Sequence, residues 1–303
     1  MEKKIRLLVV GGPTGSGKTE LALRIAERID GEIVNADSMQ IYRGMDIGTA
    51  KASPQERARV PHHLLDIVSP EVNFSASDFR EAAAKVIADI DARGKKAVVV
   101  GGTGLYIRAL LDGLVDSPHG DPELRQAFAD VPGPELLRRL SEVDPVTAAP
   151  LHPNDRVRLI RALEVFSQTG RPISEFRSEH GFSGSYYHAM KIAIKVERPE
   201  LYRRLEARVD RMLEEGLIEE VQGLLSAGYS RELKAMRSIG YKEAAAYLAG
   251  EISFSEAVDL IKRDTRRYAK RQMTWFGKEK DVYWLDYPGS FATILGHVIE
   301  FFA

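Results

Sequence analysis

The segment Gly11–Glu20, which reads GGPTGSGKTE, constrains the fold more than any other part of the sequence. It matches the phosphate-loop pattern G-x-x-x-x-G-K-[ST], in which a glycine turn between a strand and a helix wraps an anion. The preceding run IRLLVV is typical of a buried parallel strand, and the following ELALRIAERI has apolar residues at helical spacing. We therefore predict an anion-binding loop, with a glycine-rich turn and a surface lysine as the alternative. Most such loops hold ATP or GTP, but any diphosphate would satisfy the same donors.

Two side chains of this loop carry chemistry of their own. Lys18 adds a mobile positive charge, and Thr19 can offer its hydroxyl to Mg²⁺, the one cofactor that we predict. The predicted diphosphate- or nucleotide-binding residues are Gly12, Pro13, Thr14, Gly15, Ser16, Gly17, Lys18 and Thr19.

The composition excludes several classes of protein. The 303 residues, 44% of them hydrophobic, can bury a sizeable core in one large or two ordinary domains. A net charge of −1 gives no global field toward nucleic acid, so such binding must come from local basic patches. The absence of cysteine excludes disulfides, and no apolar run resembles a signal peptide or a membrane span. We expect a soluble cytoplasmic protein that does not bind membranes.

The order of predicted elements indicates an α/β fold, with a P-loop-type parallel sheet flanked by helices and a small all-helical insertion domain. Over residues 1–112, strands at EIVNADS and KKAVVVGG alternate with a helix at 75–94, capped by Ser75 or Ser77 and ended by Gly94. Residues 113–189 form the predicted insertion, with helices at 134–145 and 154–170. The core resumes over 190–303 with a strand at MKIAIKV, long helices at 198–228 and 255–277, a strand at DVYWLD and a closing helix at 291–302.

Ligands of a parallel sheet bind at the carboxyl ends of its strands, so residues 12–19, 37–40 and 101–104 should converge. Asp37 ends the second strand and could act as a general base or lie near Mg²⁺. The alternative is that Asp37 caps the following turn. Ser38 and Met39 come next, and Gln40 could hydrogen-bond a purine edge.

The third predicted strand ends in Gly101-Gly102-Thr103-Gly104, where many phosphate-loop enzymes place an aspartate that holds Mg²⁺. The bare backbone suggests room for something bulky, and the alternative is a tight turn between strand and helix.

Two other clusters deserve an interpretation. The adjacent histidines of PHHLLDI face opposite ways in an extended segment, so structural roles are favoured over a shared metal.

The late helix is basic, with aromatic residues nearby, which suits a nucleic-acid backbone; a solvated helix face is the alternative. Its basic residues are Lys262, Arg263, Arg266, Arg267, Lys270 and Arg271, and a second group in the insertion is Arg156, Arg158 and Arg161.

Several strings resemble the tRNA dimethylallyltransferase (IPP transferase) family across nearly the whole chain. They are GPTGSGKT, NADSMQIYRGMDIGTAK, HHLLDI, DFR, VVVGGTGLYIRALL, LHPNDRVRLIRALEV, IGYKEA and RRYAKRQMTWF. The resemblance implies transfer of a dimethylallyl group from dimethylallyl diphosphate to the exocyclic amine of the adenine on the 3′ side of the tRNA anticodon. The loop would then hold an isoprenoid diphosphate, and the missing aspartate is explained because no phosphoryl group is attacked.

The resemblance also implies roles for particular residues. Asp37 would be the catalytic base and Thr103 would line the channel for a flipped adenine. The anticodon stem-loop would be held by Asp37, Ser38, Met39, Gln40, Thr103, Arg125, Arg158, Arg161, Arg267 and Arg271. We expect a monomer. Two other functions remain open: a small-molecule kinase that uses ATP at the same loop, and a nucleotide-gated RNA-binding switch.

Overall fold

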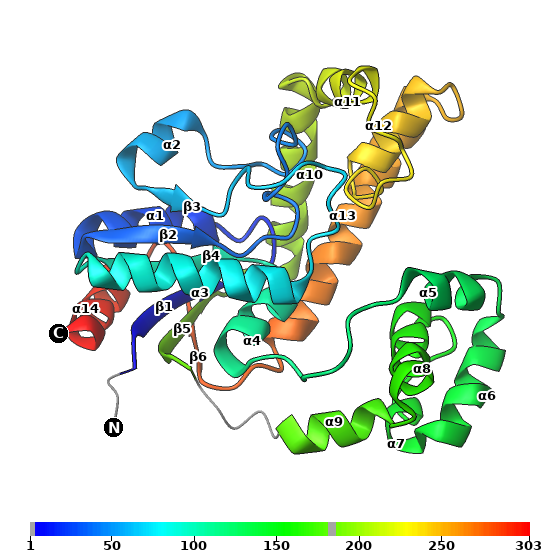
Figure 1. The fold of residues 1–303 in the computed structure, drawn as a ribbon. Coiled ribbons are helices and arrows are strands. Elements are labelled where there is room, and N and C mark those ends of the chain that lie inside the picture. The colour runs from blue at the N-terminus through cyan, green and yellow to red at the C-terminus, as the bar shows by residue number, and fades with distance from the viewer. Residues whose placement is uncertain (1–3, 181–185) are drawn as a thin grey trace. The chain divides into compact units, whose positions relative to one another are not determined.

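The strands of a computed structural model, which describes residues 4–180 and 186–303, form one parallel sheet (Figure 1). Within these residues the strand order is β3-β2-β4-β1-β5-β6, and every pairing is parallel. The predicted α/β class is confirmed. The strands are β1 Arg6–Gly11, β2 Gly31–Asn35, β3 His62–His63, β4 Lys96–Gly101, β5 His188–Ile194 and β6 Val282–Leu285.

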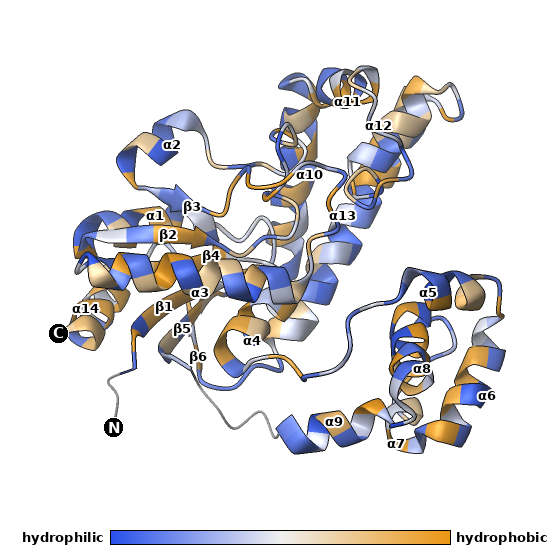
Figure 2. Cartoon of the chain, viewed as in Figure 1, coloured by the Kyte–Doolittle hydropathy of each residue, from blue (hydrophilic) through white to orange (hydrophobic). Residues whose placement is uncertain are grey.

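The apolar runs form strands because both faces of the sheet are covered. Alternate residues of β1 point to opposite sides, so Leu8 and Val10 pack with α1 (Lys18–Ile29) and α14 (Phe291–Phe302). Leu7 and Val9 pack with α3 (Ala76–Ala92) and α4 (Gly104–Asp112). Blue and orange alternate along α3 in Figure 2, as expected for a helix with one face on the sheet. Ser75 caps α3 through a capping box with Asp78, which selects Ser75 over Ser77.

A separate apolar cluster lies beyond the carboxyl ends of the strands. It joins the segment that follows β2 to the later helices through Ile41, Met45 and Tyr241. These helices are α10 Arg198–Glu214, α11 Leu217–Ser226, α12 Tyr241–Leu248 and α13 Phe254–Phe276, and the short α2 spans Pro54–Arg59. The prediction of one long helix over 198–228 is wrong, because Gly216 has a φ of 101° and divides it.

The chain divides into two compact units, residues 1–111 with 186–303, and residues 112–185. The second unit contains helices and no strand in its described part, with its own core around Leu136, Leu140 and Leu159. Its helices are α5 Pro122–Ala129, α6 Gly133–Val143, α7 Pro145–Ala148, α8 Arg156–Thr169 and α9 Ile173–His180. The predicted insertion ran to residue 189, but β5 begins at His188 because this residue pairs with Arg6 of β1.

Within the described residues, no helix combines the length and apolar character needed to cross a membrane.

Candidate active site

The phosphate loop joins the end of β1 to the start of α1, as its motif predicts. Gly12, Gly15 and Gly17 all have positive φ values, of 134°, 77° and 93°. Residues with a side chain rarely adopt these angles, so the glycines permit the tight wrap of the loop. The first helical residue is Lys18, and the amide groups at a helix start favour an anion.

Two hydroxyl groups of the loop are available to a ligand. Ser16 is almost fully buried, and its Oγ has no hydrogen-bond partner within the described residues. Buried polar atoms normally have a partner, so this atom fits a ligand oxygen. Thr19 is exposed at the first turn of α1. Within the described residues, no group of three or more acidic or histidine side chains could hold a metal ion, so Mg²⁺ at Thr19 would take most of its ligands from diphosphate and water.

Lys18 carries the charge most affected by this environment. The residue is only partly exposed, and its Nζ donates to the Pro13 carbonyl at 3.3 Å. Burial lowers the pKa of Lys18 to about 8; the Asp37 carboxylate acts in the opposite direction, and the Arg208 guanidinium lowers it further. Burial also lowers the pKa of Arg208, again opposed by Asp37. Two cations and one carboxylate therefore share a partly dehydrated space.

A cavity of about 50 Å³ brings these groups together. Its lining combines the predicted phosphate loop and second strand end with the third strand end and α10, and includes Thr14, Lys18, Thr19, Asp37, Gln40, Gly101 and Arg208. The predicted convergence of three strand ends is therefore present in the structure.

Asp37 both caps a turn and faces the cavity. Its Oδ1 accepts the Met39 amide at 2.8 Å, so the alternative in which Asp37 caps the turn is observed. The neighbouring Ser38 amide donates to the Thr103 hydroxyl oxygen at 3.0 Å, and that hydroxyl also lies 3.3 Å from Ser38 Oγ. Thr103 thus ties the Asp37 turn to the glycine turn after β4.

Gln40 is oriented by its own backbone neighbours. Its Nε2 donates to the carbonyls of Thr49 and Ala50, at 3.1 and 3.2 Å. These bonds occupy the amide nitrogen and leave the amide oxygen as the group that could meet a base.

We expected the glycines at the end of β4 to leave room for a bulky ligand. This expectation is wrong at Gly101 and Gly104, because a Cβ added at either residue would collide with the protein itself. A Cβ on Gly101 would lie 2.1 Å from the Ala36 carbonyl oxygen. A Cβ on Gly104 would lie 2.1 Å from Nε1 of Trp275. The protein fills this space itself, so the tight turn between strand and helix is the better interpretation.

The two histidines occupy the edge strand β3 and have different partners. His63 Nε2 lies 2.7 Å from Oε2 of Glu32, and His62 Nδ1 lies 2.7 Å from the Val60 carbonyl. His62 also lines the cavity, and its buried Nε2 has no partner within residues 4–180 and 186–303. The structural interpretation fits His63 fully and His62 in part.

The basic helix α13 has one row of cations turned toward α10. Lys262 pairs with Asp210 at 2.6 Å, and Arg266 pairs with Glu206 at 2.5 Å. The other row is exposed, but Arg263 and Arg267 both lie near Asp264, at 3.0 and 3.3 Å. Arg271 is exposed and lies over the ring of Tyr268, 5.6 Å from its centroid. The surface charge of this helix is therefore smaller than its composition suggests.

The predicted cations of the helical unit are also partly engaged. Arg125 and Arg161 both bind the fully buried Glu164, at 2.9 and 2.6 Å. Burial alone would raise the pKa of Glu164, but the two guanidinium groups hold it below its ordinary value. Arg156 donates to three backbone carbonyls near the end of α5, which gives it a structural role. Arg158 is the most exposed, with a single contact of 3.3 Å to Asp155.

Sequence reasoning missed three polar residues of the first unit. Arg208 lines the cavity from α10. Tyr268 has a pKa raised first by burial and then by the Asp37 charge, while polar contacts with Thr103 and Gln272 act against the rise. Gln272 is buried and contacts both glycine loops. The helix spacing of four between Tyr268 and Gln272 placed them on one face, but nothing in the sequence identified what that face meets.

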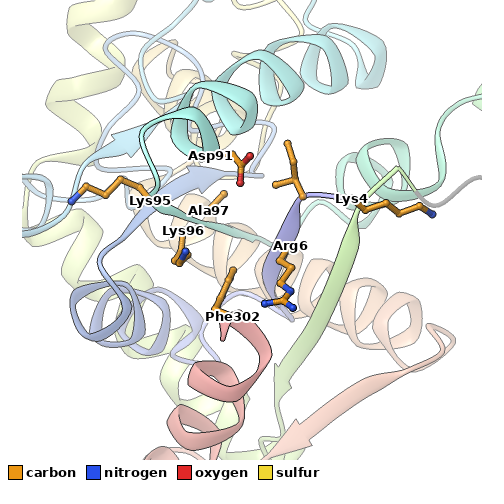
Figure 3. A pocket seen from close by; sticks show the side chains of 8 residues that line it. Lys4, Arg6, Asp91, Lys95, Lys96, Ala97 and Phe302 are labelled. Carbon is orange, nitrogen blue, oxygen red and sulfur yellow. The ribbon is translucent and has the colours of Figure 1, made fainter. Parts of the chain in front are cut away.

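A larger hollow, of about 160 Å³, lies at the opposite ends of the strands (Figure 3). Arg6 and Lys96, the first residues of β1 and β4, line it together with Asp91 and Phe302. None of the predicted site residues reaches it, so its size does not make it the candidate site.

The chain is similar to known proteins of one family. Residues 40–279 match the family model for IPP transferase. A tRNA dimethylallyltransferase 1 of Citrifermentans bemidjiense is 73% identical over the whole of this chain and 99% of its own length. The crystal structure of a tRNA isopentenylpyrophosphate transferase from Bacillus halodurans covers 99% of this chain and 97% of its own, with a TM-score of 0.74 and 39% identity. A eukaryotic dimethylallyltransferase, described as acting on tRNA, has a TM-score of 0.80 and 30% identity over 93% of this chain and 74% of its own.

The phosphate loop on a parallel sheet, with a carboxylate and two cations beside it, fits an enzyme of the group-transfer type, and the relatives are transferases. This chain belongs to the IPP transferase family.

Proposed function

We propose that this protein transfers a dimethylallyl group from dimethylallyl diphosphate to the exocyclic amine of the adenine on the 3′ side of the tRNA anticodon. The observation that carries the proposal is the single cavity shared by Lys18, Asp37 and Arg208 in a chain of this family. An anion-binding loop suits the diphosphate, and a carboxylate beside it suits removal of a proton from the incoming amine.

The chemical step can be written from these residues. A bond forms between the amine nitrogen and the allylic carbon as the bond from that carbon to the diphosphate oxygen breaks. Lys18, Arg208 and the loop amides would stabilise the negative charge that develops on the leaving diphosphate. Asp37, whose Oδ1 accepts the Met39 amide, would accept the amine proton. Mg²⁺ bound at Thr19 would add positive charge at the same diphosphate.

The acceptor would reach the site as a flipped base. Thr103 and the Ser38–Met39–Gln40 turn would line its path, and the amide oxygen of Gln40 could accept a hydrogen bond from a purine amine. Arg125, Arg158, Arg161, Arg267 and Arg271 would contact the anticodon stem-loop. We further propose that the protein works as a monomer in the cytoplasm.

The test is mass spectrometry of tRNA after incubation with the protein, dimethylallyl diphosphate and Mg²⁺. We expect an added dimethylallyl group at the adenine beside the anticodon, and loss of the product in excess EDTA. ATP consumption with a small acceptor and no modified base would instead support a kinase. Nucleotide-dependent tRNA binding without a product would support an RNA-binding switch.

A further inference from the structure

The last two turns of α13 are inserted between the two loops of the candidate site. Trp275 occupies the space beside Gly104, and Phe276 occupies the space beside Gly11, where a Cβ would come within 2.5 Å of Cε1 of the ring. Gly11 ends β1, and Gly104 begins α4 shortly after β4, so this part of α13 packs beside two of the three strand ends that converge on the cavity. Figure 1 shows the end of α13 close to α4.

Gln272 makes the polar contacts between the end of α13 and these two loops. Its Oε1 accepts the amide N–H of Thr14, in the phosphate loop, at 2.9 Å. Its Nε2 donates to the carbonyl of Gly102, in the glycine turn, at 2.9 Å. The residue is 5% exposed, and a Cβ on Gly102 would lie 2.1 Å from Nε2, so only glycine admits the amide here.

One rigid, planar amide therefore sets the distance between two backbone segments that are otherwise far apart in the sequence. On the phosphate-loop side, Thr14 belongs to the turn that would hold the donor. On the glycine-turn side, Gly102 precedes Thr103, which binds the Ser38 amide and so fixes the Asp37 turn. Without Gln272, the buried Gly102 carbonyl and the half-buried Thr14 amide would each lose this hydrogen bond, which makes the spacing costly to change.

We propose that Gln272 is a positioning residue for the transfer reaction, which holds the donor loop and the turn that supports Asp37 at their reacting distance. The inference rests on the proposed function. Bond formation requires reacting atoms within about 3–3.5 Å, and a displacement of about 1 Å can lower a rate about 100-fold. Gln272 touches neither reacting group, so it acts through the two loops.

The first test replaces Gln272 by leucine, which removes both hydrogen bonds and keeps most of the volume. We expect kcat for tRNA modification to fall about 10–100-fold, with a smaller change in KM for dimethylallyl diphosphate. The matched control is Ile87→Val, which trims the core under α3 and lowers the melting temperature without touching either loop. An equal fall in kcat in both variants would overturn the proposal, because the effect would then follow stability.

The second test uses Gln272→Glu, which separates the two hydrogen bonds by pH. An ionised carboxylate still accepts from Thr14 but repels the Gly102 carbonyl, whereas a protonated carboxyl group can donate to it and restore the bridge. We expect the ratio of variant to parent kcat to rise toward one as the pH is lowered. A ratio that stays flat with pH would overturn the bridging role.

The activity of the unsubstituted protein distinguishes failure of the proposed function from failure of the positioning role. A parent that modifies no tRNA removes the proposed function itself. An active parent with Gln272 variants of unchanged kcat removes only the positioning role.

Discussion

Lys18 should make the protein less stable near neutral pH, because its ammonium group is held in a partly dehydrated site beside Arg208. A pKa of about 8 against an ordinary 10.5 means that the site disfavours the charged ammonium relative to water, although the group is still mostly protonated at pH 7. A tenfold change in a protonation constant is worth about 1.4 kcal/mol, so the charged form costs up to about 3 kcal/mol. Lys18→Met keeps the length of the side chain and removes this cost.

The free energy of unfolding should depend on pH in a direction set by the lowered pKa of Lys18. Between about pH 8 and pH 10.5 the unfolded chain binds the proton that the folded protein has released, so parent stability rises with pH in this window. The advantage of Lys18→Met should thus be complete below about pH 8 and lost above about pH 10.5. Urea unfolding near pH 7 measures the full advantage, and the same experiment near pH 10 measures most of its loss.

A matched control is Lys85→Met, on the exposed face of α3, which should change the free energy of unfolding by less than about 0.5 kcal/mol. Inorganic diphosphate supplies a further readout, because it should stabilise the parent by mass action and the Lys18 variant much less. The reasoning is refuted if Lys18→Met is no more stable than the parent near neutral pH, or if its gain does not shrink at alkaline pH.

Three other changes test the remaining site. Asp37→Asn keeps the turn but removes the base, and should lower the rate of tRNA modification about 10²–10⁴-fold in single-turnover assays while donor affinity changes little. Arg271→Ala should flatten the slope of log tRNA affinity against log salt by about 0.7–0.9, whereas Arg156→Ala should leave the slope unchanged and lower the stability of the helical unit. Gly101→Ala should cost at least about 2 kcal/mol in urea unfolding, since its Cβ meets backbone, while Gly223→Ala, with open space in α11, should gain up to about 1 kcal/mol.

The sequence predicted the parts of the site that follow from local rules. A glycine loop between an apolar strand and a helix requires one geometry, and the carboxyl ends of parallel strands meet at one edge. The sequence therefore predicts that Lys18, Asp37 and Gln40 lie together, and all three line the cavity.

The same rules fail where a residue acts through a distant partner. Arg208 is one of many arginines in α10, and only the packing of α10 on the segment after β2 brings it to the cavity. The basic composition of α13 predicted a charged surface, but acidic residues of α10 pair with two of its cations, Lys262 and Arg266. Helical periodicity shows which residues share a face and gives no information about what that face meets.

The glycines at the end of β4 and in the turn after it show how a sequence pattern can leave the partner of a segment unidentified. A run of bare backbone is compatible both with an open wall for a ligand and with close packing of the protein on itself. Here Gln272 and Trp275 of α13 fill the space, so these glycines allow the helix to pack closely against the strand ends. The helix that presents Arg271 to solvent is then the same helix whose Gln272 contacts both the phosphate loop and the glycine turn.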